Sequence, residues 1–349
     1  MIDKNLSMSS FLALRYTEKN NVDFTEKLPY RHPSIPEETD RILVKTAEDI
    51  GVAIEGQIAE IRKKYRKIGI LLSGGMDSSI LASYLCGCDA YTFRFLGGDF
   101  QQDELRRAEN FAKECNMNLH YVDIDWSTVR DNLNPLMLSK GGPVHSIEPQ
   151  IYQGAVQAKR DGVDLMVIGD GSDYVFGGMD QLLSKDWGFE EFYHRYIYVE
   201  PEEILNEPVS VRYLFEQYRD GDKIDFLKFM DIVATEESYG SYSNAFLTAD
   251  LAYFDPYEKL KMADPLDLNR IRNGESKYLI RELFKLRYPH ISVPEKRPMP
   301  RPVDAYFADW NGPVRSEFKK EIDISKYSGN QKWLIWCLEQ FLNMLDNMY

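Results

Sequence analysis

The chain has 349 residues, of which 44% are hydrophobic, and its glycines and prolines form no low-complexity tract. This is the composition of an ordinary globular protein with one large domain or two modest ones. The formal net charge is −14. Because proteins that bind a phosphate backbone usually present a basic face, nucleic acid is a disfavoured partner and small-molecule chemistry is favoured.

Cysteine usage and hydropathy indicate the cellular setting. Four cysteines are too few for a disulfide framework in a chain of this length. The N-terminus has no basic–apolar leader, and no apolar run approaches the length of a membrane span. We therefore expect a soluble, cytoplasmic protein with no membrane partner. Cys86 and Cys88 allow a redox or metal pair as an alternative, but no second Cys/His pair stands at zinc spacing, which favours a packing role.

The N-terminal part divides into two segments. Residues 1–37 are predicted to be irregular, because three prolines between residues 29 and 36 break any long element, and Phe11–Tyr16 is at most one short strand. From Glu37 to about Tyr65, apolar residues recur at helical spacing without a proline. This pattern predicts one long amphipathic helix.

Short apolar strands then alternate with helices. The predicted strands are Ile68–Leu72, Ala90–Phe95, Leu119–Ile124 and Leu165–Ile168, and the predicted helices are Asp77–Leu85, Asp103–Cys115 and Pro149–Arg160. Such alternation is typical of an α/β fold with a doubly wound parallel sheet, in which ligands bind at the carboxyl ends of the strands. We expect residues 38–185 to form this half, and residues 186–349 to form a mainly helical layer that completes the same domain.

A glycine-rich loop lies between the first strand of this series and its first helix. Gly74 and Gly75 let the backbone turn tightly and bring N–H donors close to an anion. The hydroxyls of Ser73 and Ser78 add donors, and the helix directs its positive end at the same place. Asp77 cannot bind phosphate itself, so it predicts a bridging cation, Mg²⁺. A plain glycine turn with a helix cap is the alternative, but strand, loop and apolar helix together favour phosphate binding.

The segment Ser73-Gly-Gly-Met-Asp-Ser78 resembles the PP-loop of the ATP pyrophosphatases. The resemblance implies an adenine nucleotide alpha hydrolase-like fold and cleavage of ATP between the α- and β-phosphates. No Gly-Lys-Ser/Thr follows, so the loop is not a Walker A motif and transfer of the γ-phosphoryl group is not indicated. The loop alone does not choose among the members, which include NAD, GMP and asparagine synthetases and tRNA-modifying enzymes.

A second segment narrows the choice. Gly169-Asp-Gly-Ser-Asp-Tyr-Val-Phe-Gly-Gly178 resembles the G-E/D-G-x-D-E-x-F-G-G-Y segment of the asparagine synthetase and β-lactam synthetase family. Further matches, over about residues 40–310, are Asp103-Glu104, His120, Phe254-Asp255-Pro256, Lys277–Arg281 and Pro302-Val303-Asp304. The chain departs from the family at Tyr174, where a Glu is usual, and at Met179, where a Tyr is usual. These departures leave the identity of the acceptor open.

The resemblance assigns roles to residues of both loops. The expected ATP and pyrophosphate contacts are Leu72, Ser73, Gly74, Gly75, Asp77, Ser78 and Gly169. Asp77 and Asp173 stand at neighbouring strand ends and are the expected Mg²⁺ ligands, with a turn or cap role as the alternative for Asp173. Asparagine synthetases place a carboxylate at the position of Asp170, where the β-lactam branch has tyrosine. A carboxylate can take a proton from an attacking amine, which favours amidation over ring closure; a solvated turn residue is the alternative.

Two lysines complete the expected catalytic set. The resemblance places Lys296 near the α-phosphate, where a cation stabilises the charge that develops as pyrophosphate leaves. Because the family's K-x-G-F pattern is lost here, Arg297 and Arg301 are alternatives, as is a solvated basic loop. Lys277 and Arg281 lie on one side of a predicted helix and are expected to face the site, with a surface salt bridge as the alternative.

These resemblances imply a ligase in which ATP adenylates a carboxylate and ammonia or an amine forms the amide. Aspartate is the default acceptor, and a carboxylate of a specialised or nucleotide-modifying pathway is the close alternative. The family's N-terminal glutaminase, with its cysteine after Met, has no counterpart, since residue 2 is Ile. The nitrogen is therefore expected from outside this chain, including from a separate glutaminase. A nucleic-acid-modifying enzyme and a non-catalytic subunit are competing hypotheses, and a homo-oligomer is left open.

Overall fold

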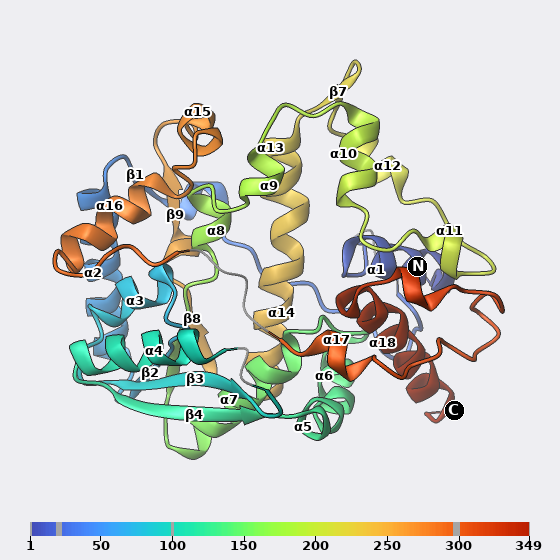
Figure 1. The fold of residues 1–349 in the computed structure, drawn as a ribbon, viewed down its shortest axis with the longest axis horizontal. Coiled ribbons are helices and arrows are strands. Elements are labelled where there is room, and N and C mark those ends of the chain that lie inside the picture. The colour runs from blue at the N-terminus through green and yellow to red at the C-terminus, as the bar shows by residue number, and fades with distance from the viewer. Residues whose placement is uncertain (1, 19–22, 99–100, 296–300, 349) are drawn as a thin grey trace.

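The computed structural model describes residues 2–18, 23–98, 101–295 and 301–348, and at its centre is a parallel sheet with helices on both faces (Figure 1). The strand order is β4-β3-β2-β5-β8. The strands are β2 (Ile68–Leu71), β3 (Asp89–Phe95), β4 (Asn118–Ile124), β5 (Leu165–Val167) and β8 (Ala252–Phe254). The predicted α/β class with a doubly wound parallel sheet is confirmed, and the four predicted strands are correct to within one residue at each end.

Side chains that alternate along the strands build a core on each face of the sheet. Ile68 and Ile70 of β2 pack in one core, whereas Met166 of β5 packs in the other, as expected for side chains that alternate between faces. The first core includes residues of α2 (Ala47–Lys64), α3 (Met76–Ala82) and α4 (Gln102–Glu114). The second includes residues of α5 (Trp126–Asp131), α6 (Leu133–Lys140) and α7 (Glu148–Arg160).

The order of the strands reverses direction between β2 and β5. From β2 the chain adds β3 and β4 on one side, and then β5 and β8 on the other. In open α/β sheets, ligands bind at this kind of switch point, beyond the carboxyl ends of the strands. The two loops singled out in the sequence follow β2 and β5, so both lie at the switch point.

The N-terminal predictions are wrong in two places. Residues 1–37 are not irregular throughout, because α1 (Lys4–Leu14) is a helix that begins at Asp3, whose side chain accepts a hydrogen bond from Leu6 N. Phe11–Tyr16 is therefore not a strand. Its residues Phe11 to Leu14 form the buried last turn of α1, which packs against the C-terminal helix α18 (Gly329–Asp346).

The long helix predicted from Glu37 is also shorter than expected. It begins as α2 at Ala47, where Thr46 and Asp49 form a capping box. The preceding residues form β1 (Ile42–Val44), which pairs in parallel with β9 (Leu260–Met262). Ile42 and Leu43 fall at helical spacing by chance, and the partner strand lies too far along the chain for a local pattern to predict it.

The second half of the chain is mainly helical, as predicted. Two short helices, α8 (Ser172–Val175) and α9 (Asp180–Leu183), precede residue 186. The helices of the second half are α10 (Phe189–Tyr196), α11 (Pro201–Ile204), α12 (Arg212–Glu216), α13 (Phe226–Phe229), α14 (Thr235–Thr248), α15 (Leu268–Arg272), α16 (Tyr278–Arg287), α17 (Val303–Tyr306) and α18. A π-helical turn joins α13 to α14, and β6 (Arg219–Asp220) pairs with β7 (Lys223–Ile224). Both cores draw side chains from both halves; the domain boundary near residue 185 stays a prediction.

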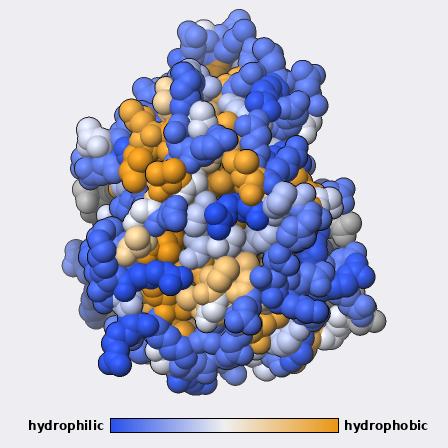
Figure 2. Space-filling view, turned by 90° about the vertical axis from the view of Figure 1, so that its left-hand side faces the viewer, coloured by the Kyte–Doolittle hydropathy of each residue, from blue (hydrophilic) through white to orange (hydrophobic). Residues whose placement is uncertain are grey.

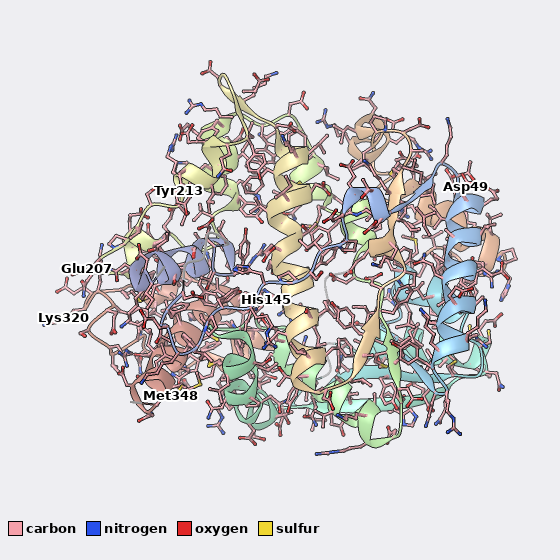
Figure 3. The ribbon with its side chains drawn as sticks, turned by 180° about the vertical axis from the view of Figure 1, so that it is seen from behind. Asp49, His145, Glu207, Tyr213, Lys320 and Met348 are labelled. Atoms are coloured by element: carbon pink, nitrogen blue, oxygen red, sulfur yellow. The ribbon has the colours of Figure 1, made fainter. Side chains whose placement is uncertain are left out.

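Helix α14 stands at the centre of the molecule, between the sheet and the helices that include α1 and α18 (Figures 1 and 3).

None of the helices in the described part of the chain is both long enough and apolar enough to cross a bilayer. Figure 2 shows the face that carries α2 and β1, where hydrophobic side chains gather in patches on a mostly hydrophilic surface. Ile42, Leu43 and Val52 are among the exposed hydrophobic residues of these elements.

Candidate active site

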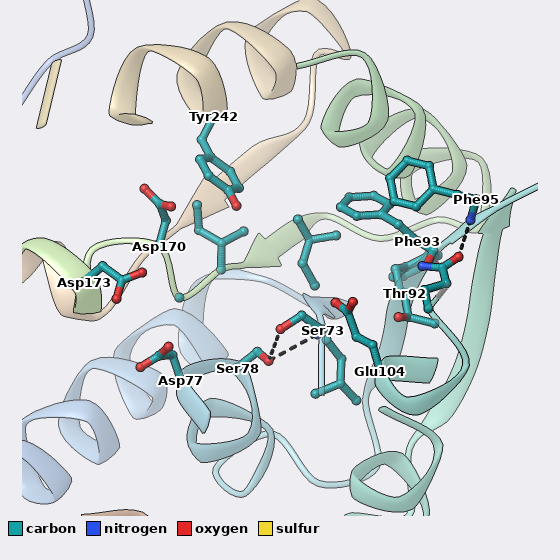
Figure 4. A pocket seen from close by; sticks show the side chains of 16 residues that line it. Ser73, Asp77, Ser78, Thr92, Phe93, Phe95, Glu104, Asp170, Asp173 and Tyr242 are labelled. Carbon is teal, nitrogen blue, oxygen red and sulfur yellow. Dashed lines mark hydrogen bonds between the residues drawn. The ribbon is translucent and has the colours of Figure 1, made fainter. Parts of the chain in front are cut away.

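The loops after β2 and β5 line one pocket at the switch point (Figure 4). Its walls include the predicted residues Leu72, Ser73, Asp77, Ser78, Gly169, Asp170 and Asp173, together with Thr92, Phe93, Gln101, Glu104 and Tyr242. A second pocket adjoins it and shares Ser73, Asp77, Glu104 and Asp173. The volumes are about 130 Å³ and 180 Å³, so neither alone reaches the several hundred Å³ usual for a ligand. An extended ligand would span both.

The glycine loop is closely packed against α4. Gly74 has φ +74°, and a Cβ atom there would lie 2.7 Å from Ala108 N and 2.8 Å from Glu104 O. Only glycine fits this backbone without displacing the helix. The loop predicted to bend around an anion is thus held in position by the helix that also supplies Glu104.

Hydroxyl groups satisfy backbone donors within the loop. Ser73 N donates to Ser78 Oγ at 3.2 Å, and Gly75 N donates to Ser73 Oγ at 3.2 Å. The two hydroxyls lie 3.1 Å apart (Figure 4). These groups therefore face each other across the loop, and an anion that enters it would compete for the same donors.

Asp77 and Asp173 converge on one cation. The ammonium of Lys277 lies 2.8 Å from Asp77 Oδ2 and 2.6 Å from Asp173 Oδ1. Ser172 Oγ donates to the other oxygen of Asp77 at 2.7 Å. Burial opposes the charge on Lys277, but the two carboxylates outweigh it and raise the pKa of the ammonium. The sequence placed these three residues in one site, and the structure brings them into direct contact.

Lys277 reaches this position through an unusual backbone. Its φ is +53°, in the left-handed region, and it caps α16 rather than lying within it. The sequence predicted that Lys277 and Arg281 face the site from one side of a helix. Lys277 is not inside the helix, so that reason is wrong, but both residues do line the second pocket. A Cβ on Gly178 would collide with Asp173 Oδ1 and Lys277 Cε. A left-handed backbone at a non-glycine residue, as at Lys277, is strained, and such strain is often found at functional sites.

The carboxylates of Asp77 and Asp173 suit Mg²⁺ in chemistry, since hard oxygen donors are its preferred ligands. They are close enough to share one cation, as their contacts with Lys277 show. In the described residues no group of three or more His, Cys, Asp or Glu side chains is arranged to hold a metal. The two carboxylates fit Mg²⁺ in chemistry, and they would hold it only together with oxygen donors from outside this donor set.

The second pocket has a basic wall that sequence reasoning did not predict in full. Arg107 and Arg281 line it beside Lys277. The Nε atom of Arg107 is buried and has no hydrogen-bond acceptor among the described residues. Burial raises the pKa of Glu104 to about 7, and Arg107 opposes this rise. A buried donor without an acceptor, beside two further cations, indicates a place for an anion.

Asp170 lines the first pocket on the side of α14. Its Oδ2 accepts a hydrogen bond from Ser238 Oγ at 2.5 Å, and the Tyr242 hydroxyl points into the same pocket (Figure 4). Burial raises the pKa of Asp170 to about 8; the hydrogen bond from Ser238 opposes the rise, and Asp255 and Asp173 add to it. Ser238 and Tyr242 are one helical turn apart, and nothing in the local sequence marked either residue as part of the site.

Asp255 of the Phe254-Asp255-Pro256 motif is a buried support for the second loop. Its Oδ2 accepts from Gly171 N at 2.7 Å and its Oδ1 accepts from Tyr257 N at 2.9 Å. These bonds fix the turn between Asp170 and Asp173 to the end of β8. Its part in the site is to position the backbone of that loop.

Other predicted residues lie elsewhere. Lys296 and Arg297 fall outside the described residues. Arg301 donates to Ser146 Oγ and lines neither pocket. His120 lies on β4, the edge strand farthest from β8, where its Nε2 is 3.0 Å from Asp89 Oδ1. Of the Asp103-Glu104 pair only Glu104 faces the pocket, because Asp103 is exposed and pairs with Arg106.

The fold and site define an α/β protein with a glycine-rich loop at the switch point of its parallel sheet. The family model described as "Asparagine synthase" matches residues 55–239. The chain belongs to this family. A curated relative, the "putative asparagine synthetase (glutamine-hydrolyzing) 1" of Methanocaldococcus jannaschii, is 26% identical over an alignment of 152 residues that covers 40% of this chain. The match spans about a quarter (26%) of that relative's length.

Two solved structures show weak overall likeness. The U34-tRNA thiolase NcsA of Methanococcus maripaludis, solved with its 4Fe-4S cluster, has a TM-score of 0.34 at 11% identity, covering 86% of this chain and 80% of that one. The NMN synthetase of Francisella tularensis has a TM-score of 0.30 at 9% identity, covering 73% and 99%. Likeness at this level bears on neither the fold nor the function of this chain.

Proposed function

We propose that this protein uses ATP to adenylate a carboxylate and then forms an amide with ammonia or an amine. A carboxylate oxygen attacks the α-phosphorus, the bond to the β-phosphate breaks, and pyrophosphate leaves. The amine nitrogen then attacks the acyl carbon, the bond to AMP breaks, and the nitrogen loses a proton. The convergence of Asp77, Asp173 and Lys277 beside Asp170 is the observation that carries this proposal.

Each side chain has a place in this scheme. The first pocket takes the adenosine, next to Thr92, Phe93 and Gln101. The second pocket takes the leaving pyrophosphate, where Lys277, Arg107 and Arg281 stabilise its charge. Asp77 and Asp173 would hold Mg²⁺, which, when bound, neutralises the charge on the phosphate oxygens. Family membership and the acidic groups at both strand ends support this assignment.

Asp170 is the proposed proton acceptor for the attacking amine. It stands apart from the basic wall and is held by Ser238 in a fixed orientation. In its ionised form, which prevails above its raised pKa of about 8, this carboxylate would take the proton that the nitrogen loses as the amide forms. Lys296 remains the proposed cation near the α-phosphate on the family resemblance, with Arg297 as the alternative. Arg301, the other alternative, hydrogen-bonds Ser146 and lines neither pocket, so it is not proposed for this role.

The function is tested by incubating the protein with ATP, Mg²⁺, ammonium and a panel of carboxylates, and measuring AMP and pyrophosphate. We expect release of both products with at least one carboxylate and formation of its amide. ADP and phosphate as the products, or no turnover with the whole panel, would contradict the proposal. Aspartate belongs in the panel as the default acceptor, together with carboxylates of specialised or nucleotide-modifying pathways.

Replacement of Asp170 by Asn should separate the two half-reactions. The substitution keeps the size of the side chain and its acceptor for Ser238 but removes the basic carboxylate. We expect ATP–pyrophosphate exchange within a few fold of the wild type and amide formation slowed by about 10²–10⁴-fold. Equal losses in both steps would show that Asp170 acts in adenylation or in folding instead.

The source of nitrogen is a separate question. We propose free ammonia, an amine or a glutaminase partner, since no glutaminase segment is recognised in this sequence. Co-purification with a glutaminase, and amide formation from glutamine in the mixture, would identify the partner. A nucleic-acid-modifying role predicts tRNA binding in a low-salt gel shift, which the net charge of −14 disfavours.

A further inference from the structure

A third pocket opens from the candidate active site. It shares Asp173 with both pockets described above. Its volume is about 640 Å³, whereas theirs are about 130 Å³ and 180 Å³, so of the three it alone falls within the range usual for a small-molecule ligand. The proposed function, on which this inference rests, assigns the two smaller pockets to adenosine and pyrophosphate. The third pocket therefore remains for another substrate.

Apolar side chains from distant segments line this third pocket (Figure 1). They include Leu260 and Met262 of β9, Leu227 of α13, and Ile232 of the π-helical turn that joins α13 to α14. Leu227 and Ile232 are 38% and 48% exposed, so they face open space rather than either core. A π-helical turn within a helix is rare and is often found at functional sites. Apolar surface and irregular helix thus occur together, next to the reaction site.

The charges of the third pocket are already matched. Each of the six charged residues in its lining has an oppositely charged partner. The pairs within the lining are Glu38–Lys261 and Arg41–Asp231, and the pairs with neighbouring residues are Asp173–Lys277 and Asp264–Lys45. A substrate with a second ionic group would have to displace one of these partners and lose part of its own hydration. The pocket therefore favours a neutral, apolar body.

Tyr174 adds to this preference. It stands where the family resemblance leads one to expect Glu, and it lines the third pocket directly after Asp173. Its ring packs edge-on against the ring of Tyr239, with 5.8 Å between the ring centroids. An aromatic ring in place of a carboxylate removes a negative charge from the wall and adds apolar surface. The departure at Tyr174 thus acts in the same direction as the matched charges.

The third pocket reaches the place where the acid must react. The α-phosphate lies between adenosine and pyrophosphate, and therefore beside residues that the two smaller pockets share, which include Ser73, Asp77 and Asp173. A carboxylate that attacks the α-phosphorus must come to this place, and Asp173 is where the third pocket adjoins it. Ammonia needs no pocket of this size. The substrate whose body fills the third pocket is therefore the carboxylic acid.

We propose that the acceptor is a monocarboxylic acid with a bulky apolar body, aryl or long-chain alkyl, which lies in the third pocket, rather than aspartate. Each methylene group that the pocket removes from water strengthens binding by about threefold to fourfold. An apolar body of several carbons therefore gives a preference over small or charged acids that an enzyme assay resolves.

The test compares acids of different size in the assay of AMP release with ATP, Mg²⁺ and ammonium. The panel consists of phenylpropanoate, phenylbutanoate, octanoate, acetate and aspartate. We expect kcat/KM for at least one of the three bulky acids to exceed the values for acetate and aspartate by about tenfold or more. A parallel mixture of acetate and phenethylamine tests whether a bulky amine uses the pocket instead.

Ile232→Asn tests the wall of the third pocket. We expect it to raise the KM for the preferred bulky acid by about tenfold, while the KM for ATP and the kcat/KM for acetate stay within about twofold. Ile232→Leu keeps an apolar side chain and should retain the preference. Leu247→Asn is the matched control and should behave as the wild type, because Leu247 is 49% exposed on α14 and lines none of the three pockets.

Three results would overturn this inference while leaving adenylation intact. They are equal or better use of acetate or aspartate by the wild type, an unchanged KM for the bulky acid in Ile232→Asn, and faster turnover of acetate with phenethylamine than of any bulky acid with ammonium. An absence of AMP release with every acid would instead contradict the proposed function. If Ile232→Asn fails to fold, Leu227→Asn supplies the same comparison.

Discussion

Asp77→Asn is expected to reduce ATP–pyrophosphate exchange by about 10²–10³-fold or more, because it removes the charge of one of the two carboxylates that we propose as Mg²⁺ ligands. Apart from the lost charge, the substitution leaves the neighbouring contacts in place. Asn keeps an oxygen that accepts from Ser172, and Lys277 keeps its pairing with Asp173. The fold should therefore survive, and the loss should fall on chemistry. Exchange is measured with labelled pyrophosphate at saturating ATP and acceptor.

Asp250→Asn is a suitable control for this experiment. Asp250 is 94% exposed, and its φ of +52° is a conformation that Asn tolerates well. It pairs only with Lys159 at the surface among the described residues. If Asp77→Asn retains exchange at the level of this control, Asp77 is not a ligand of a metal–phosphate complex.

Lys140→Met is expected to destabilise the protein by about 3–5 kcal/mol, because it leaves a buried carboxylate without its cation. Lys140 at the end of α6 lies 2.5 Å from Glu148 at the start of α7, and the two side chains are 2% and 0% exposed. Glu148 also accepts from Asn244 of α14 at 2.8 Å. One ion pair thus ties three helices together, and α14 is the helix that carries Ser238 and Tyr242.

The free energy of unfolding is measured by urea titration. The wild type and Lys140→Met are compared by their transition midpoints, with the same dependence of the free energy on urea concentration used for both. The double variant Lys140→Met/Glu148→Gln is the informative partner, since it removes the unpaired charge and should be clearly more stable than Lys140→Met. Equal stability of the single and double variants would show that the cost is one of packing and not of charge.

Four of the five strands were predictable because they are short segments rich in apolar residues that alternate with helices, whereas the edge strand β8 was not predicted. The two loops that line the pocket, Ser73–Asp77 and Gly169–Asp173, were also predictable. Each is a local motif directly after a strand that the sequence predicts. Parallel strands bring their carboxyl ends together, so the proximity of Asp77 and Asp173 could be expected. Lys277 was placed by the family resemblance, but its left-handed backbone was not foreseen.

The remaining parts of the site depend on contacts between distant segments. Ser238 reaches Asp170 only because α14 crosses the switch point, and no local pattern distinguishes it from any other helical serine. Arg107 lies one residue beyond an exposed arginine on α4, and its burial follows from the packing of the loop on that helix. The β1–β9 pairing likewise replaced a helix that periodicity had predicted.

The edge strand β8 has a consequence for how this chain folds. It pairs in parallel with β5, and the whole stretch from α8 to α14 lies between the two strands in sequence. During synthesis, β5 therefore emerges long before the strand that covers its edge and before Lys277, the counter-charge of Asp77 and Asp173. Such long-range pairing is slow to form and leaves an open strand edge exposed. We expect the nascent chain to be most prone to aggregation while the ribosome is translating this stretch.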